Sequence, residues 1–213
     1  MVVWYPQASD HTGVQFSRSL EQQMRLLILT LLAASLTTNT FADCPPYDRK
    51  DYRHWTDDDK DCQNTRHEVL VEESLTPVTF KTSKGCKVIS GSWLGAYSGK
   101  VFTDASKLDI DHLVPLKEAH ESGGYAWDAY KRREYANDLS DPNTLIAVDR
   151  GLSRQKGADD PAEWLPPNQA YQVEYAQGWV AVKLKWGLTA DAREITTLRE
   201  ILGSEAELPI MAE

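Results

Sequence analysis

The sequence predicts a mixed α+β fold, in which short strands lie ahead of a set of C-terminal helices. Residues 78–81 and 86–93 are rich in β-branched and aromatic side chains and flank a Ser-Lys-Gly turn, which is typical of a hairpin. Residues 109–116 read Asp-Ile-Asp-His-Leu-Val-Pro-Leu and indicate a strand that ends near its proline. Residues 168–186 carry bulky side chains at helical spacing.

The other elements follow from caps, breakers and short apolar runs. Asn64 or Thr65 is a plausible N-cap for the first helix, and the sequence Asp-Pro-Ala-Glu at 160–163 indicates another helix start. Gly187 and Gly203 should end the last two helices, with Thr189 capping the second of them. The remaining expected elements are a helix over 64–74, a short strand at 100–102, helices over 116–122 and 126–137, a buried strand at 145–148 and a helical turn within 150–156.

The N-terminal part of the chain predicts export. Residues 24–42 contain one arginine, an apolar run and a cleavage site after Ala42, as in a signal peptide. The run is too short for a comfortable membrane span, so no stable membrane anchor is expected; a buried helix is the alternative. Residues 1–23 are interpreted as a start-site artefact, residues 43–60 as a polar lead-in and residues 61–205 as the folded domain.

Export to the extracellular space or the periplasm implies an oxidising compartment, where disulfides persist. Cys62 and Cys86 both lie in the patterned region and are expected to be bridged, whereas Cys44 is expected to be free or intermolecular. A structural zinc site is disfavoured because the sequence has neither a Cys-x-x-Cys nor a His-x-x-x-His pair. The aspartates at 57–61 lack the ligand spacing of a calcium loop and read as a solvated turn.

The chain of 213 residues has a net charge of −9. An acidic protein repels polyanions at long range, which counts against tight binding of nucleic acid over its whole surface. The net charge is nevertheless compatible with a local basic groove that also binds a metal ion.

The octet at 109–116 holds the side chains that point most directly to chemistry. In a strand, Asp109 and Asp111 share one face while Ile110 and His112 share the other. An aspartate that binds a hard divalent cation beside a neutral histidine that takes a proton from water is suited to phosphodiester hydrolysis. The alternative is a strand end with a solvated Asp-His pair.

Three segments then follow in order: the Asp-Ile-Asp-His strand, a short strand preceded by Asn143, and the turn Ser153-Arg-Gln-Lys-Gly157. This order resembles the HNH endonucleases with their ββα-metal finger. It is most similar to secreted HNH proteins whose core is like the nuclease domain of GmrSD-type modification-dependent restriction enzymes. The resemblance runs from about Tyr47 to Leu202. It rests on Cys62-Gln-Asn-Thr-Arg66, Gly91-Ser-Trp93, Tyr97-Ser-Gly-Lys100, the octet, Glu118-Ala119, Ser122-Gly123, Ala136-Asn-Asp138, Asn143, Lys156-Gly157 and Asp160-Pro-Ala-Glu-Trp-Leu-Pro166.

The resemblance implies a role for each matched residue. His112 corresponds to the general base, Asp111 to the metal-binding acid, and Asn143 to the asparagine that positions the loop and the histidine ring. Ser153 stands where relatives carry a second metal ligand, His or Asn. Its hydroxyl is a weaker ligand, a water could replace it, or the site could be inactive; Asp109 is the next candidate ligand.

Basic residues near the last position complete the expected site. Arg154 and Lys156 would contact phosphates, or else lie on a solvated helix face. Arg66 could face the same phosphate or pair with an acid. The resulting expectation is an exported endonuclease that cuts nucleic acid, with DNA favoured, using Mg²⁺ or alternatively Mn²⁺, Ca²⁺ or Zn²⁺. No protein partner is expected. The rival interpretation is a catalytically impaired HNH-like domain with an extracellular binding or structural role, and Ser153 favours it.

Overall fold

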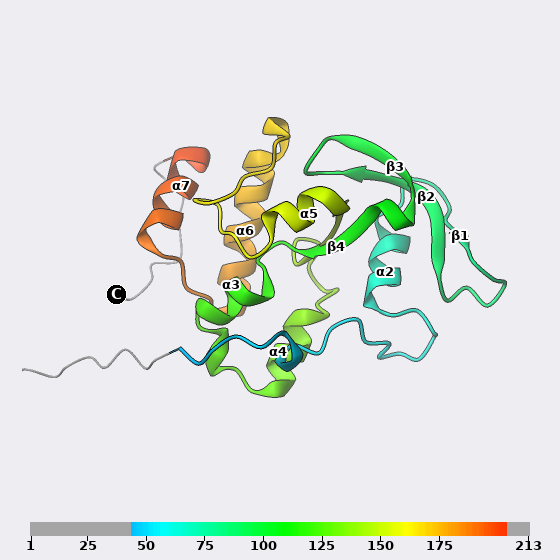
Figure 1. Ribbon diagram of the computed structural model, residues 1–213, viewed down its shortest axis with the longest axis horizontal. Helices are drawn as coiled ribbons and strands as arrows, with labels where there is room; N and C mark the ends of the chain where they lie inside the picture. The colour runs from blue at the N-terminus through cyan, green and yellow to red at the C-terminus, as the bar shows by residue number, and fades with distance from the viewer. Residues whose placement is uncertain (1–43, 204–213) are drawn as a thin grey trace, which may run out of the picture. The chain divides into compact units, whose positions relative to one another are not determined.

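Two small antiparallel sheets and a group of helices form the part of the chain that the computed structural model describes, residues 44–203 (Figure 1). The predicted signal peptide and the segment before it lie outside these residues. The strands are β1 (Thr79–Phe80), β2 (Val88–Gly95), β3 (Lys100–Asp104), β4 (Leu108–His112) and β5 (Leu145–Asp149). The α-helices are α2 (Thr65–Glu72), α3 (Leu116–Glu121), α4 (Ala129–Ala136), α5 (Arg150–Lys156), α6 (Gln172–Trp186) and α7 (Ala192–Leu202). Single 3₁₀ turns are η1 (Arg49–Asp51), η2 (Ala105–Lys107), η3 (Gly124–Ala126) and η4 (Gln169–Tyr171).

The predicted α+β class is confirmed, and the order strand, strand, helix falls where the sequence placed it. β4 pairs with β5 in antiparallel register, with Asp111 opposite Ile146 and His112 opposite Leu145. α5 begins at the residue after β5 and packs against β4. β1, β2 and β3 form the other sheet. Because all five residues of β5 are buried, this strand fixes both β4 and α5 to the core.

Two hydrophobic clusters stabilise this arrangement. The larger one surrounds Trp179 of α6 and includes the buried rings of Tyr52, Tyr135 and Tyr175. The aromatic stripe of α6 is therefore core packing, as its single-face spacing indicates. The smaller cluster lies between α2 and β2 around Leu70 and Trp93. No helix among residues 44–203 is both long enough and apolar enough to cross a membrane.

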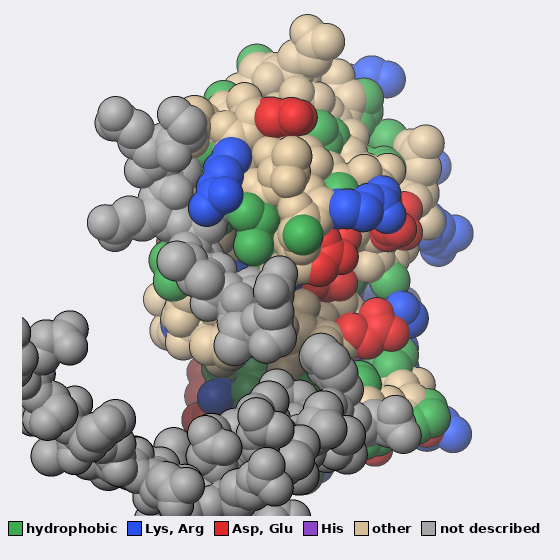
Figure 2. Space-filling model, turned by 90° about the vertical axis from the view of Figure 1, so that its left-hand side faces the viewer, with side chains coloured by type: hydrophobic (Ala, Val, Ile, Leu, Met, Phe, Trp, Pro, Cys, Tyr) green, Lys and Arg blue, Asp and Glu red, His purple; other side chains and the backbone are tan. Residues whose placement is uncertain are grey.

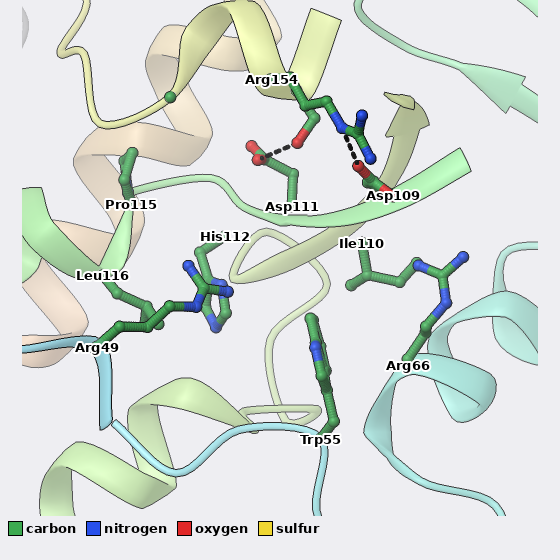
Figure 3. A pocket seen from close by; sticks show the side chains of 12 residues that line it. Arg49, Trp55, Arg66, Asp109, Ile110, Asp111, His112, Pro115, Leu116 and Arg154 are labelled. Atoms are coloured by element: carbon green, nitrogen blue, oxygen red, sulfur yellow. Dashed lines mark hydrogen bonds and ion pairs between the residues drawn. The ribbon is translucent and has the colours of Figure 1, made fainter. Parts of the chain in front are cut away.

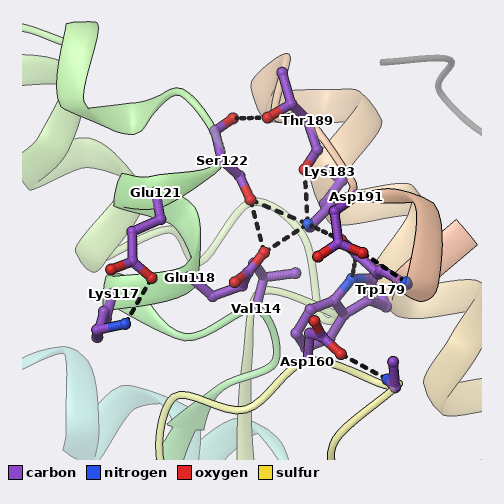
Figure 4. A network of polar contacts seen from close by, with 12 residues as sticks. Val114, Lys117, Glu118, Glu121, Ser122, Asp160, Trp179, Lys183, Thr189 and Asp191 are labelled. Carbon is purple, nitrogen blue, oxygen red and sulfur yellow. Dashed lines mark hydrogen bonds and ion pairs between the residues drawn. The ribbon is translucent and has the colours of Figure 1, made fainter. Parts of the chain in front are cut away.

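A buried lysine joins the helices that follow β4 to the C-terminal pair (Figure 4). Nζ of Lys183 on α6 donates to Glu118 and Glu194, at 2.7 Å each, and to the carbonyl of Thr189, also at 2.7 Å. The Ser122 hydroxyl lies 3.1 Å from the same nitrogen. Since a buried ammonium without acceptors would be costly, these partners fix α3, α6 and α7 relative to one another.

Several local predictions hold and three need correction. Asn64 caps α2, and Gly187 ends α6 in the left-handed conformation. The helix expected from Asp160 is only one turn, because Pro166 and Pro167 disfavour helical backbone just after it. The long helix begins at residue 172, after a 3₁₀ turn, instead of at 168. Asp191 caps α7, and the hydroxyl of Thr189 instead donates to the Ser122 carbonyl.

The segment at residues 44–60 packs onto the domain instead of forming an extended lead-in. Tyr52 is fully buried, and its hydroxyl donates to Nδ1 of His120 at 3.2 Å. Nε2 of His120 donates to the Pro45 carbonyl, and Nδ2 of Asn137 donates to the Arg53 carbonyl. These bonds tie the segment to α3 and to the end of α4, so that it can carry side chains onto β4.

The disulfide expected from the sequence is confirmed. Cys62 and Cys86 are bridged, with their Cα atoms 5.0 Å apart, and Cys44 is a free, exposed cysteine. The bridge joins the residues just before α2 to the start of β2. It thereby holds the outer end of the β1–β2 hairpin against the helix that packs under it.

Candidate active site

A pocket of about 350 Å³ opens along the free edge of β4 (Figure 3). Its wall combines segments that are far apart in the sequence. The side chains that matter for chemistry are Arg49 and Trp55 from the N-terminal segment, Arg66 from α2, Asp109, Asp111 and His112 from β4, and Ser153 and Arg154 from α5. Five of the seven site residues predicted beside the disulfide thus line one pocket, and Lys156 and Asn143 do not.

The strand pleat sends the two kinds of catalytic candidate to opposite sides of β4. In Figure 3, Asp109 and Asp111 point toward α5, whereas Ile110 and His112 point toward the N-terminal segment. Both sets still reach the same pocket because it runs along the edge of the strand. The alternation expected from the sequence is therefore present, and side chains from both faces of the strand line the pocket.

The Asp111 carboxylate accepts hydrogen bonds from three side chains. Its Oδ2 accepts from the Tyr97 hydroxyl at 2.7 Å and from Nζ of Lys156 at 2.6 Å. Its Oδ1 accepts from the Ser153 hydroxyl at 2.9 Å. Tyr97 and Lys156 approach from the protein interior, and Ser153 lies on the pocket side. The carboxylate is thus fixed in orientation, with Oδ1 as the oxygen that faces the pocket wall.

Lys156 lies below the pocket and is wholly buried, with 0% of its surface exposed. Its ammonium also donates to the carbonyl of His112 at 2.9 Å. Burial lowers the pKa of Lys156, and the adjacent Asp111 opposes that shift. The expectation that Lys156 contacts a phosphate is corrected, because its nitrogen is already bonded inside the protein and has no exposed surface.

His112 is held by one ring nitrogen. Its Nε2 lies 3.0 Å from the carbonyl oxygen of Ala136 at the end of α4. Since a carbonyl can only accept, Nε2 carries the proton, and in the neutral ring Nδ1 is the nitrogen that can accept one. Burial lowers the pKa of His112 to about 4, so the ring is neutral near pH 7.

The ring of Trp55 restricts His112 from the other side. The two ring centroids are 5.7 Å apart and their planes differ by 30°. Trp55 has a positive φ of 58°, an unfavourable backbone conformation for a bulky residue. The bonds that tie the N-terminal segment to α3 and α4 hold this residue in place beside His112.

Three arginines give the pocket a local positive character within an acidic protein. Arg49 extends toward His112, and Arg154 lies on the opposite side, above β4 (Figure 3). Arg66 donates from Nη2 to the carbonyls of Ala105, at 3.2 Å, and Leu108, at 2.9 Å. The question that the sequence left open is answered by these bonds: Arg66 lines the pocket and bonds to backbone, not to an acid.

Asp109 lies between two arginines of α5. Its Oδ1 is 3.4 Å from Nε of Arg150, and its Oδ2 is 3.6 Å from Nε of Arg154. Both carboxylate oxygens therefore face guanidinium groups. This arrangement suits Asp109 to orienting the arginines, and it leaves Asp111 as the carboxylate beside Ser153.

Asn143 lies outside the pocket, in the loop before β5. Its Nδ2 donates to Oδ1 of Asp141 at 3.0 Å, and its backbone N–H donates to the same oxygen. Its amide oxygen would lie 3.0 Å from a Cβ placed on Gly178, so α6 approaches the loop closely there. Asn143 thus shapes the loop, while the carbonyl of Ala136 orients the ring of His112.

A divalent metal, which the resemblance implies, can be tested against these donors. Adjacent ligands of an octahedral Mg²⁺ at 2.0–2.1 Å lie about 2.9 Å apart. Oδ1 of Asp111 and Oγ of Ser153 are separated by 2.9 Å and both belong to pocket-lining residues. Tyr97 and Lys156 on Oδ2 are the kind of outer partners that orient a ligating carboxylate. Two oxygens of the kind that a hard cation prefers therefore lie together at the pocket, where a hydrogen bond now joins them and Lys156 offsets the charge of Asp111.

Arg49, Trp55 and the role of Tyr97 were not anticipated from the sequence. Tyr97 lies in a motif that supported the resemblance, but nothing in it indicates that the hydroxyl reaches Asp111. Arg49 and Trp55 lie in a segment with no periodicity, so only its packing on α3 and α4 reveals them. Tyr52, which lies between the two in sequence, is fully buried and anchors the segment to the domain.

Comparisons with known proteins show the family to which the chain belongs. Residues 50–201 match the family described as GmrSD restriction endonucleases, C-terminal domain. An "Uncharacterized secreted protein" of Arthroderma benhamiae is 35% identical over 173 residues, which cover 81% of this chain and 82% of that protein. No solved structure matches the chain. The protein belongs to the family of the GmrSD restriction endonuclease C-terminal domain.

Proposed function

We propose that this protein is an exported endonuclease that hydrolyses phosphodiester bonds in DNA with the help of a divalent metal ion. The observation that carries the proposal is the state of His112. Its Nε2 is bonded to the Ala136 carbonyl, its ring is neutral near pH 7, and it lines a pocket with three arginines. A neutral imidazole with one free nitrogen is the form that a general base requires.

His112 would take a proton from the attacking water at Nδ1. The Ala136 carbonyl keeps the Nε2 proton in place during this step and stabilises the imidazolium that forms. Trp55 limits rotation of the ring away from this position. The position of the base is therefore set before substrate arrives, which is how a protein avoids the cost of ordering the group during reaction.

Arg49, Arg66 and Arg154 would bind the phosphate oxygens. Three guanidinium groups around one pocket match the geometry and charge of a phosphodiester, and they stabilise the additional charge of the pentacovalent transition state. Their concentration at one place offsets the repulsion expected from a chain with a net charge of −9. These arginines should make the pocket favour an anionic phosphodiester over a neutral ester.

Oδ1 of Asp111 and Oγ of Ser153 would hold the metal ion, with Mg²⁺ the first candidate and Mn²⁺, Ca²⁺ or Zn²⁺ as alternatives. When bound, such an ion stabilises negative charge on the phosphate and on the leaving oxygen. Tyr97 and Lys156 keep the carboxylate turned so that Oδ1 remains available. Because Lys156 offsets the charge of Asp111, the pocket alone should bind the ion weakly, and the substrate phosphate should supply further ligands.

Export is supported by two observations. The disulfide between Cys62 and Cys86 requires an oxidising compartment to persist, and the related protein of Arthroderma benhamiae is described as secreted. The proposed enzyme therefore acts on nucleic acid outside the cytosol, in the extracellular space or the periplasm.

Digestion of supercoiled plasmid by the oxidised mature protein tests the proposal. Nicking with Mg²⁺ or Mn²⁺ that stops with EDTA supports it, and parallel digestion of RNA tests the preference for DNA. A second function, binding of nucleic acid without cleavage, is favoured by the weakness of the metal site. Ser153 is a poorer ligand than His or Asn, and the charge of Lys156 offsets that of Asp111. A protein that binds the plasmid in a gel-shift assay but leaves it uncut with every metal would be a binding domain, and the endonuclease proposal would be rejected.

A further inference from the structure

A second hollow adjoins the active-site pocket on the outer side of α5. It encloses about 630 Å³ and is bounded by β3, η2, the end of β5 and α5. Arg154 lines both this hollow and the active-site pocket, so the two adjoin at this side chain. We refer to it as the α5 groove; its lining includes Phe102, Lys107, Arg150, Leu152 and Arg154.

The rim of the α5 groove is basic and its floor is apolar. Lys107 is exposed, and the side chains of Arg150 and Arg154 are 41% and 72% exposed. Phe102 and Leu152 are partly buried beneath them. The one acid that lines the groove, Asp149, has its Oδ2 engaged by the Ser98 hydroxyl at 2.7 Å. An exposed cationic rim over an apolar floor suits a sugar-phosphate chain.

Asp109 organises this rim from the active-site side. Its carboxylate forms an ion pair with Nε of Arg150 and another with Nε of Arg154. Since a guanidinium has five N–H donors in a planar fork, this leaves the terminal N–H groups of both arginines to bind a phosphate. The same carboxylate therefore aligns an arginine of the active site with an arginine of the groove.

The charge pattern of another face gives a useful contrast. On the α7 side of the molecule, blue and red side chains are interspersed in the described part of the surface (Figure 2). Charges mixed in this way cancel at the range of a polyanion. The α5 groove instead gathers three cations next to a pocket that already holds Arg49 and Arg66.

We propose that the α5 groove binds the phosphates of the substrate polynucleotide that flank the cleaved bond, with Lys107 and Arg150 as its contacts. The position of Arg154 in the lining of both hollows and the charge of the rim carry this inference, which rests on the proposed function for the identity of the substrate. The groove extends the site from one phosphodiester to several. Binding should therefore depend on the length of the nucleic acid, whereas hydrolysis of a single small phosphodiester should not depend on Lys107, which lines the groove and not the active-site pocket.

The test is the salt dependence of binding, measured in EDTA so that no cleavage occurs. The protein is titrated into a fluorescein-labelled DNA duplex of about 20 base pairs at several salt concentrations. Each phosphate contact contributes about 0.9 to the slope of log affinity against log salt for duplex DNA. The double variant Lys107→Gln/Arg150→Gln should therefore lower the magnitude of the slope by about 1.8.

The matched control is Lys84→Gln/Arg193→Gln, which makes the same charge change on the β1–β2 turn and on α7, away from the groove. Equal slopes for the two double variants would overturn the inference, since only net charge would then matter. Hydrolysis of bis(p-nitrophenyl) phosphate by the single variant Lys107→Gln, whose side chain lines the groove and not the active-site pocket, should match the wild type. A large loss there would also overturn the inference.

The two proposals fail separately in this experiment. If the wild-type protein binds the duplex with the expected slope but never cuts it, the groove proposal is kept and the endonuclease proposal is rejected. If the wild-type protein cuts plasmid but the two double variants have equal salt-dependence slopes, the endonuclease proposal is kept and the groove proposal is rejected.

Discussion

Nζ of Lys156 lies 2.6 Å from Oδ2 of Asp111, and the lysine has no exposed surface. The pair connects α5 to β4 directly beneath the candidate metal ligands. It therefore has two consequences: it fixes the orientation of the Asp111 carboxylate, and it makes the stability of the domain depend on a charge that lies in the site.

Replacing the lysine tests this dependence. Lys156→Met leaves the buried Asp111 carboxylate without its cation and should lower the free energy of unfolding by about 3–5 kcal/mol. Asp111→Asn/Lys156→Met should lose clearly less than the sum of the single variants, because the second change removes the unpaired charge. The measurement is chemical denaturation of all three variants.

The exposed pair of Lys117 and Glu121 is a matched control, since its N–O distance is also 2.6 Å while both side chains are nearly half exposed. Lys117→Met should change the stability by less than about 1 kcal/mol. Equal effects of Lys117→Met and Lys156→Met would show that burial of the Lys156–Asp111 pair does not increase its contribution to the free energy of unfolding.

Ser153→Asn should lower the Mg²⁺ concentration needed for cleavage. An amide oxygen reaches further than a hydroxyl and is a better neutral donor to a hard cation. Asn and Ser have similar helix propensities, so α5 should be maintained. Cleavage rate is measured against Mg²⁺ concentration, with Ser153→Ala as the variant that should need more metal. If Ser153→Asn cleaves more slowly than wild type at every Mg²⁺ concentration, Ser153 is not a ligand of the metal ion.

Removing the disulfide should cost about 3 kcal/mol of stability in the chain-entropy model, given that the bridged cysteines are 24 positions apart. The Cys62→Ser/Cys86→Ser variant is compared with wild type by thermal and chemical unfolding. Cys44→Ser, at the free and exposed cysteine, serves as the control and should change nothing. A double variant as stable as Cys44→Ser would contradict the expected contribution of the bridge.

Glu73 should make stability depend on pH. Burial raises the pKa of Glu73 to about 7 in the folded protein, against 4.5 for the ordinary side chain, and a hydrogen bond from the Ala147 N–H partly opposes this. Because the folded pKa is the higher one, folding favours the protonated acid. Its stabilisation is complete below pH 4.5 and is lost as the pH rises through 7.

Glu73→Gln keeps an acceptor for Ala147 and cannot ionise. It should therefore be more stable than wild type at pH 8, on the order of 2 kcal/mol, and equal to it near pH 4. Glu194, whose pKa burial also raises to about 7, should leave some pH dependence in the variant. A stability difference between variant and wild type that stays constant from pH 4 to 8 would rule out ionisation of Glu73 as the cause.

The sequence alone located β4, β5 and α5, because each carries a local signal: an Asp-His strand ending at a proline, a run of apolar residues, and a basic turn before Gly157. Because β4 pairs with β5 and α5 follows β5 directly, the same signals also place Asp111, His112 and Ser153 near one another. What local patterns cannot give is the direction of a long side chain. Lys156 and Arg154 are two residues apart on α5, and only packing decides that one is buried against Asp111 while the other faces the pocket.

The N-terminal segment shows the same limit. Its polar composition predicts an extended chain, yet single contacts through His120 and Asn137 fold it back over the site. Such contacts join residues about 75 to 84 positions apart, a separation that no periodicity records. Arg49 and Trp55 therefore become visible only in the folded protein.

Plasmid nicking by His112→Ala, compared with His67→Ala at a histidine outside the pocket, tests the role of His112 as general base most directly. Once circular dichroism shows that it is folded, His112→Ala should cut about 10²–10⁴-fold more slowly than wild type with Mg²⁺, as expected on loss of a general base, while His67→Ala should cut at the wild-type rate. Undiminished nicking by folded His112→Ala would exclude His112 as the general base.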